Sequence, residues 1–217
     1  MSGAEAAVVI GFISGIISIV TAIKQTYDAV NDKDGLPEAF REVAGRLPVV
    51  HDTLEAAKAQ IQVNESNAIS EGVTGIIKAC DRKAEKLKEI FQKICPQGED
   101  SRAERYLKVV RGMGKGGRVE DLMRGILEDL QLLAGNRVIH LASEGKALSA
   151  AIKDISALKP SISDEELPET GNNYNQYGDG HMFNTLGGKN LWNFGDGNQF
   201  QGENQYFGEI FKQGRKG

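Results

Sequence analysis

The amino-acid pattern changes once along this chain, and that change limits what the chain can fold into. Up to Lys159, apolar residues recur at the three- and four-residue spacing of helices. From Gly171 onward that spacing is absent, and glycine, asparagine and aromatic residues prevail. Pro160 and Pro168 bracket an acidic stretch between the two patterns. The predicted parts are a helical domain over 1–159, an acidic linker over 160–170 and a tail over 171–217.

Glycine, proline and polar turn residues divide the first part into about five helices. The predicted helices cover residues 4–31, 37–63, 64–94, 101–111 and 119–158. Pro48 is expected to kink or split the second helix, because proline lacks a backbone donor. Gly135 and Asn136 are expected to bend the fifth. The stripe of the fifth helix, apolar except for Arg137, comprises Leu122, Ile126, Leu130, Leu133, Arg137, Val138, Leu141, Leu148, Ile152 and Ile155. The predicted fold is an all-α helical bundle.

The first helix contains eighteen successive residues without a charge, from Ala6 to Ile23, which is close to the lower limit for crossing a bilayer. Small residues recur every four positions on two neighbouring faces, as Ala7, Gly11 and Gly15 and as Ser14, Ser18 and Ala22. Rows of this kind allow close helix packing in lipid. We expect this helix to lie buried at the centre of the resting bundle, with its glycines admitting a close neighbour. The more specific hypothesis is that this helix also has a second location, in a membrane.

The tail has a composition of its own. It holds nine of the fourteen aromatic residues and eleven of the twenty-six glycines, together with eight asparagines and five glutamines. Polar and aromatic segments of this kind are typically disordered as monomers and prone to β-assembly. Residues 161–217, which include the acidic linker, carry four basic and eight acidic residues, whereas residues 1–160 carry 22 of each. The small number of basic residues and the net negative charge of 161–217 argue against an RNA-binding tail and against nucleic acid as a partner.

The tail also repeats itself at an offset of seventeen residues. The segment 177–184 aligns with 194–201, with an aromatic residue, Gly-Asp-Gly and an aromatic-amide pair coinciding. Gly-Asp-Gly suits a turn, and the flanking residues suit strands that stack into ladders, so we predict β-arcs that assemble between chains. A calcium-binding parallel β-helix matches the pattern poorly. The predicted assembly residues are Tyr177, Gly178, Asp179, Gly180, Phe183, Asn184, Trp192, Phe194, Gly195, Asp196, Gly197, Asn198, Gln199, Phe200, Gln201 and Gly202.

The two parts together resemble the fungal HeLo-like family, which includes the HET-S incompatibility protein and SesA-type N-terminal domains. The domain resemblance covers residues 1–159 and rests on the apolar first helix with its spaced glycines. The tail resembles amyloid signalling motifs, through the segment 193–202, and the sigma and RHIM-like types both remain open. The resemblance implies a membrane-insertion and glycine-zipper set of Ala7, Gly11, Phe12, Gly15, Ser18 and Ala22.

The resemblance also implies a mechanism and its partners. An NLR-type receptor with a matching amyloid motif would template the tail, which would then self-assemble into fibrils. The first helix would leave the bundle and disrupt or perforate the plasma membrane by contact with anionic lipids. The protein would be cytoplasmic at rest and lie at the cell periphery once activated. Two alternatives are an adaptor or regulator that assembles without damaging membranes, and an orphan receptor module.

The sequence contains only weak candidates for nucleotide-binding, metal-binding or catalytic motifs. The segment 112–117 fits G-x-G-x-x-G, but no strand precedes it, so we interpret it as a loop between helices. The histidines have no metal-ligand spacing, and no catalytic triad can be argued, so we predict no enzyme, metal or cofactor. Cys80 and Cys95 are expected to be buried free thiols. Basic residues also recur at three- and four-residue spacing, as Arg102, Arg105, Lys108, Arg111, Lys115 and Arg118. We expect this basic row to be a solvated helix face; the alternative is that it binds anionic lipid head groups.

Overall fold

The structure is a computed structural model, in which the chain forms two compact units, 1–170 and 171–217. The described residues are 3–33, 35–63, 71–96, 98, 100–136, 139, 141, 143–167, 182–186 and 189–193. The helices are α1 (Gly3–Asp28), α2 (Glu38–Val63), α3 (Glu71–Ile94), α4 (Arg102–Met113), α5 (Val119–Ala134) and α6 (Glu144–Ser156). Two short 3-10 turns are η1 (Lys115–Gly117) and η2 (Asp164–Glu166). The predicted all-α bundle is confirmed.

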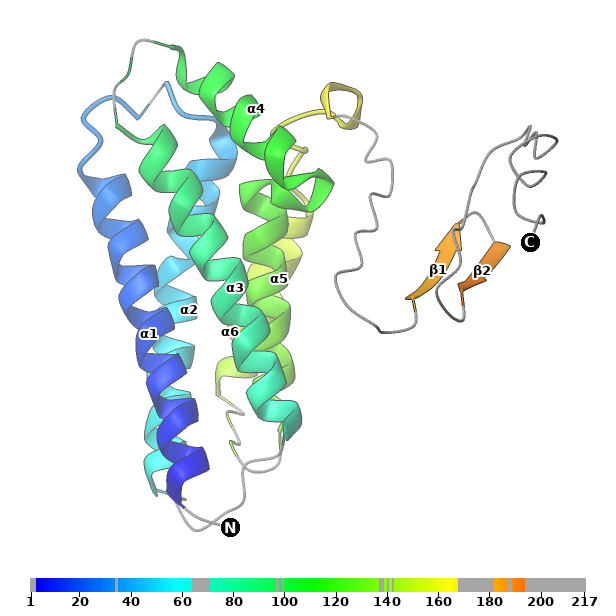
Figure 1. Ribbon diagram of the computed structural model, residues 1–217. Helices are drawn as coiled ribbons and strands as arrows, with labels where there is room; N and C mark the ends of the chain where they lie inside the picture. Colours follow the sequence, from blue (N-terminus) through cyan, green and yellow to red (C-terminus); the bar gives the residue numbers. More distant parts are fainter. Residues whose placement is uncertain are drawn as a thin grey trace, which may run out of the picture. The chain divides into compact units, whose positions relative to one another are not determined.

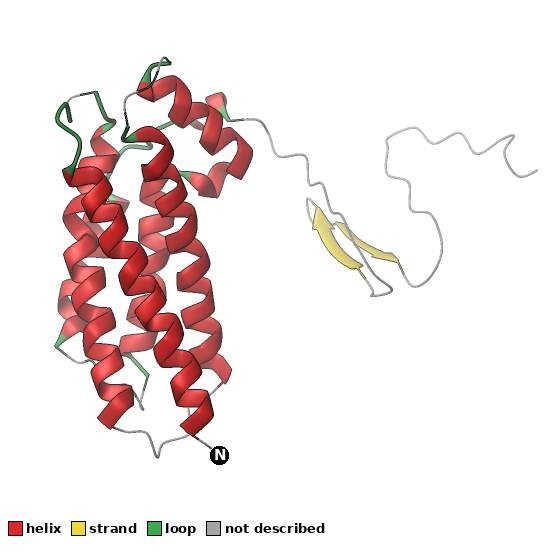
Figure 2. Ribbon diagram, turned by 60° about the vertical axis from the view of Figure 1, so that its left-hand side comes forward, coloured by secondary structure: helices red, strands yellow, loops and turns green. Residues whose placement is uncertain are grey.

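Four long helices surround one core in the first unit. α1 packs against α2 and α3, and α5 closes the ring by packing against the same two helices. α6 covers α5 and α2, while α4 packs against α3 across one end of the bundle (Figure 1). The long helices run side by side in both views (Figure 2). α1 is therefore one of the outer members of the bundle, and no described helix covers its far face.

Apolar periodicity accounts for this packing. The buried residues of the predicted stripe are Leu122, Ile126, Leu130, Leu133, Leu141, Leu148 and Ile155. Ile152 packs against the core while partly exposed, and Arg137 and Val138 lie outside the described residues. At the end of the bundle near α4, aromatic rings from four helices form a row. Its ring centroids are 6.2 Å apart for Tyr27 and Phe91, 4.9 Å for Phe91 and Phe40, and 5.1 Å for Phe40 and Tyr106.

Of the two effects expected of Pro48, a kink or a split, the split does not occur, since α2 continues without a break through Pro48. Proline removes one backbone hydrogen bond from a helix interior. Leu47 and Val50 on either side of it are buried to 1% and 0% exposure. The packed face of α2 is therefore continuous across the proline, and its burial offsets the lost hydrogen bond.

The predicted fifth helix is two helices. α5 ends at Ala134, where the Gly135 amide donates to the Gln131 carbonyl, and α6 begins only at Glu144. The sequence signal of Gly135 and Asn136 was a helix end rather than a bend. The break lets α6 fold back against α5, which buries Leu148 and Ile155.

The second unit contains a β-hairpin within its described residues. β1 (Met182–Leu186) pairs antiparallel with β2 (Lys189–Asn193), and Phe183 lies opposite Trp192. The stacked β-arcs predicted for the assembled tail concern contacts between chains, which a single chain does not test. Most of the predicted assembly residues lie outside the described residues; those in the hairpin are Phe183, Asn184 and Trp192.

The first eight residues of the predicted linker are packed against the bundle, and we call residues 160–167 the strap. Ile162 is 5% exposed and Leu167 is 3% exposed. η2 lies within the strap and is capped by Ser163, whose side chain and amide both bond to the Glu166 carboxylate. The part of the predicted acidic linker that forms the strap is thus docked on the bundle, because two apolar side chains anchor it.

Candidate functional site

The buried face of α1 consists of bulky aliphatic residues. Val9, Ile13, Ile16, Val20 and Ile23 are each 3% exposed or less. Ile10 and Ile17 flank them and pack against the core while partly exposed. The bulky residues of the first helix therefore face the core of the bundle.

The opposite face of α1 carries the predicted small residues. Ala7, Gly11, Gly15 and Ser18 are exposed, and Ala22 is half-buried. A methyl group added at Gly11 or Gly15 would meet no described atom outside the helix within 4 Å. The prediction of a central helix whose glycines admit a close neighbour is thus wrong. Each glycine costs a helix about 0.5–1 kcal/mol relative to alanine, and no packing among the described residues compensates for it.

Phe12 differs from the small residues of the predicted set. Its side chain is partly buried, and the Lys78 ammonium of α3 lies 5.7 Å from its ring centroid. A cation over an aromatic face is a weak attraction at a partly exposed site. Phe12 thus holds the edge of α1 against α3 in the resting bundle.

Hydrogen bonds made by the described α1 side chains stay within the helix. Ser18, Thr21 and Thr26 donate to the carbonyls four residues earlier, at 2.9, 2.9 and 2.8 Å. Lys24 and Asp28 form an ion pair on the same helix. Hydroxyl groups bonded in this way do not depend on water or on a neighbouring helix. α1 is therefore held to the bundle mainly by apolar packing.

The composition of α1 also suits a bilayer. Residues Glu5–Asp28 are long and apolar enough to cross a membrane, with a mean hydropathy of 2.5 over the most apolar window. A core helix of a soluble protein passes the same test, but only 39% of this window is buried. The helix thus combines the hydropathy of a membrane span with the exposure of a surface helix.

The predicted solvated face holds for only part of the basic row, because Lys108 and Arg111 are exposed, Arg102 and Arg105 are half-buried, and Arg118 is buried. Arg105 donates to the carbonyls of Lys93, Ile94 and Pro96 at 2.7, 3.3 and 2.7 Å, at the C-terminal end of α3. Arg102 donates to the Cys95 carbonyl at 3.2 Å. Carbonyl groups at a helix end lack partners within the helix and carry the negative end of its dipole. These arginines therefore stabilise the fold.

The rest of the row is also engaged where its side chains are described. Lys108 pairs with Asp100 at 2.8 Å on the surface, and Arg111 donates to the Glu166 carbonyl at 3.0 Å. Arg118 forms ion pairs with Asp164 and, at 3.7 Å, with Asp121. The alternative interpretation, a row free to meet lipid head groups, is not favoured by these contacts.

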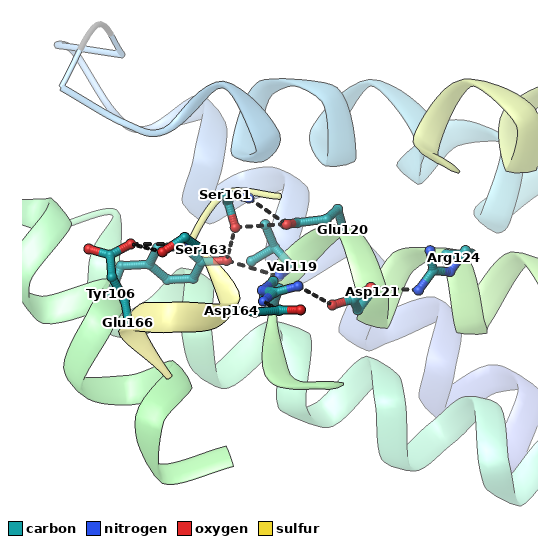
Figure 3. Close-up of polar contacts among 10 residues, drawn as sticks. Tyr106, Val119, Glu120, Asp121, Arg124, Ser161, Ser163, Asp164 and Glu166 are labelled. Atoms are coloured by element: carbon teal, nitrogen blue, oxygen red, sulfur yellow. Dashed lines mark hydrogen bonds and ion pairs between the residues drawn. The ribbon is translucent and has the colours of Figure 1, made fainter. Parts of the chain in front are cut away.

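A buried polar cluster joins the strap to α4 and α5 (Figure 3). The Glu120 carboxylate accepts from the Ser161 amide at 2.7 Å and from the Ser161 hydroxyl at 2.8 Å. The Tyr106 hydroxyl lies 2.8 Å from the Ser161 hydroxyl and accepts from the Val119 amide at 3.1 Å. Burial, reinforced by the nearby Glu120 carboxylate, holds the pKa of Tyr106 above its ordinary value. Glu120, which is 7% exposed, takes both of those bonds from the strap.

The cysteines are buried free thiols, as predicted. Burial raises the pKa of Cys80 to about 12 and that of Cys95 to about 11. Both therefore stay protonated at neutral pH and are poor nucleophiles. Over the described part of the chain, no group of three or more potential metal ligands is found.

The hairpin is a feature that the sequence interpretation missed. The Gly187-Gly188 pair is a two-residue turn signal, but the runs on either side of it do not alternate polar and apolar residues, so the sequence showed no clear strand pattern. The buried cluster had no comparable signal, since Glu120 and Ser161 lie forty-one residues apart and share no recognisable motif.

Comparison with known families identifies the class of the helical unit. Residues 13–133, more than half of the chain, match the SesA family, described as an N-terminal domain on NACHT_NTPase and P-loop NTPases. The chain therefore belongs to the SesA family. This membership confirms the predicted resemblance for the domain and links the chain with NACHT-type cell-death signalling. The amyloid motif of the tail stays a prediction. No curated protein and no solved structure is significantly similar to the chain.

Proposed function

We propose that this protein is a membrane-targeting executioner of programmed cell death, switched on when a receptor of the NLR type templates its C-terminal motif. The observation that carries the proposal is the state of α1 in the resting bundle. Its buried contacts are almost wholly apolar, its hydroxyl groups are satisfied internally, and its small residues are exposed. A helix with these properties can exchange one apolar environment for another.

The burial of α1 itself favours this exchange. Moving its buried face from the core to hydrocarbon replaces one apolar contact by another, so α1 keeps its own hydrophobic gain, while the α2 and α3 faces that it covered need a new apolar partner. Every backbone group of a helix interior is already paired, which a lipid environment requires. The exposed row of Ala7, Gly11 and Gly15 would then allow two or more such helices to pack closely, because packing drives helix association in lipid.

Exposed cations beside α1 support anionic lipids as the target. Lys78, Arg82 and Lys86 recur every four residues on α3 and are exposed, and Lys78 touches the ring of Phe12. Basic residues next to a membrane-active helix gain about 1 kcal/mol each near an anionic surface. This row takes the role that the sequence suggested for the row on α4.

The tail supports the other half of the proposal. Its repeated Gly-Asp-Gly segments and its aromatic and amide residues favour in-register stacking between chains. A receptor carrying a matching segment would supply the first layer of the stack, on which the tails of this protein assemble. The resting protein would be cytoplasmic, and assembly would bring many copies of α1 to the plasma membrane.

Seeded assembly of the full-length protein tests the templating step. Preformed fibrils of residues 171–217 are expected to abolish the lag before the full-length protein sediments as thioflavin-positive fibres. The control is a chain truncated after Leu167, which keeps the strap and should stay soluble with the same seed. Absence of fibres with any seed would remove the basis for templating. Fibres that form without harming membranes would favour the adaptor.

A further inference from the structure

The β-hairpin of the second unit takes up part of the repeat in the tail. We call residues 177–184 the first copy and residues 194–201 the second copy. The last three residues of the first copy, 182–184, lie in β1. β2 ends at Asn193, directly before the second copy begins at Phe194. The hairpin, drawn in yellow in Figure 2, therefore holds the end of the first copy and no residue of the second.

The pairing in the hairpin differs from the pairing that stacking requires. β1 and β2 are antiparallel, with Phe183 opposite Trp192 and Asn184 opposite Leu191. In-register parallel stacking instead places each residue beside the same residue of the next chain. If the two copies stack on each other, Phe183 lies beside Phe200, seventeen residues further along. Neither kind of stack pairs Phe183 with Trp192.

The hairpin and the stack compete for the same backbone groups. Each of these residues has one N–H donor and one C=O acceptor on its main chain. In an antiparallel pair, every second residue of a strand exchanges both bonds with the partner strand. In a stack, those groups bond to the chains above and below. The groups that join β1 to β2 thus become available for stacking only when the hairpin opens.

We propose that the β1–β2 hairpin is a brake on assembly of the tail, because it holds the end of the first copy in a pairing that the stack does not contain. The proposal rests on the proposed function, in which stacked tails are the active state. An isolated two-stranded hairpin is only marginally stable in water, so a small free energy opens it. A template offsets that cost by offering new pairing, whereas a lone chain meets it first. The hairpin therefore delays spontaneous assembly more than templated assembly.

The connection between the strands allows the hairpin to be changed without changing either copy. Leu186 pairs with Lys189, so two residues, Gly187 and Gly188, connect the strands. Two-residue connections of this kind favour positive φ at their residues, and Asn-Gly suits them best. A β-branched residue is strained at positive φ. G187N should therefore strengthen the hairpin and G187V should weaken it, while both leave the predicted assembly residues intact.

Two measurements on the full-length protein test the brake. Hydrogen exchange of the β1 and β2 amides reports the hairpin in the soluble protein, and the lag before thioflavin-positive fibres appear without seed reports spontaneous assembly. G187N is expected to slow exchange roughly two- to fivefold and to lengthen the lag by a similar factor. G187V is expected to speed exchange and shorten the lag at least about twofold. Preformed fibrils of residues 171–217 should shrink the difference between the two variants.

The matched controls are G171N and G171V, since Gly171 lies in the tail but outside both copies and the hairpin. Both should keep the wild-type lag. Wild-type β1 and β2 amides that exchange as fast as an unstructured chain would overturn the brake. So would equal lags of G187N and G187V when their exchange rates differ, or fibres absent from G187V as from wild type.

The brake and the proposed function can fail separately. Equal lags of the two Gly187 variants, together with normal seeding of the wild type, would overturn the brake and leave templating intact. Lags that separate as expected, in a protein that fibrils of residues 171–217 do not seed, would support the brake and count against templating. Neither measurement needs a membrane, so the result does not depend on the executioner role.

Discussion

Replacing Gly11 and Gly15 together by leucine is expected to reduce seeded dye leakage from anionic liposomes at least tenfold while leaving the folded protein intact. Neither position has a described atom from outside the helix within 4 Å, so the bundle can accept both side chains. Helix propensity then favours leucine over glycine, by about 0.5–1 kcal/mol per site. In lipid, two leucines would block the close approach of helices that the small row permits.

Gly45 and Gly75 provide the matched control for this double variant. They lie inside α2 and α3, are exposed, and likewise have no described atom from outside their helices within 4 Å. The variant G45L/G75L should gain similar stability in urea unfolding and keep its full leakage activity. Undiminished leakage by G11L/G15L, with seeded fibres as in wild type, would show that the exposed row has no role in membranes.

Substituting Phe40 by alanine is expected to lower the free energy of unfolding by about 3–5 kcal/mol. Phe40 is 0% exposed, and it lies between the rings of Phe91 and Tyr106. Its removal leaves a cavity where α2, α3 and α4 meet and separates the two halves of the aromatic row. Urea unfolding of the full-length variant measures the loss.

Phe12 is the control for this truncation, because it is partly buried and lies outside the row. The variant F12A should lose about 1 kcal/mol, in proportion to the smaller apolar area removed from water. A loss below about 1.5 kcal/mol for F40A, well short of the range for a buried aromatic side chain, would mean that the aromatic row is not a major support of the bundle.

Much of the helical unit could be predicted from the sequence, because burial follows local periodicity. The stripe through Leu122, Ile126 and Leu130 identified the face of α5 that packs inward. Ser101 begins the predicted fourth helix, and its hydroxyl accepts from the Glu104 amide at 3.2 Å as the N-cap of α4. These features depend on residues a few positions apart, which a sequence displays directly.

Features that depend on distant residues could not be predicted. The sequence showed that Gly11 and Gly15 share a face, but only the packing of α1 against α2 and α3 shows that this face has no described neighbour in the bundle. The acidic stretch looked like a linker by composition, while its docking depends on Glu120, far back in the chain. Buried apolar residues in the strap are limited to Ile162 and Leu167, too few for periodicity to reveal.

The most direct measurement of the central claim is dye leakage from anionic liposomes by the full-length protein, with and without preformed fibrils of residues 171–217. We expect leakage that requires the seed, is weaker with neutral lipid and is lost in G11L/G15L. Leakage that needs both the protein and the seed would indicate that assembly of the tail triggers the membrane activity of the first helix. Seeded fibres that leave anionic liposomes intact would contradict the executioner role.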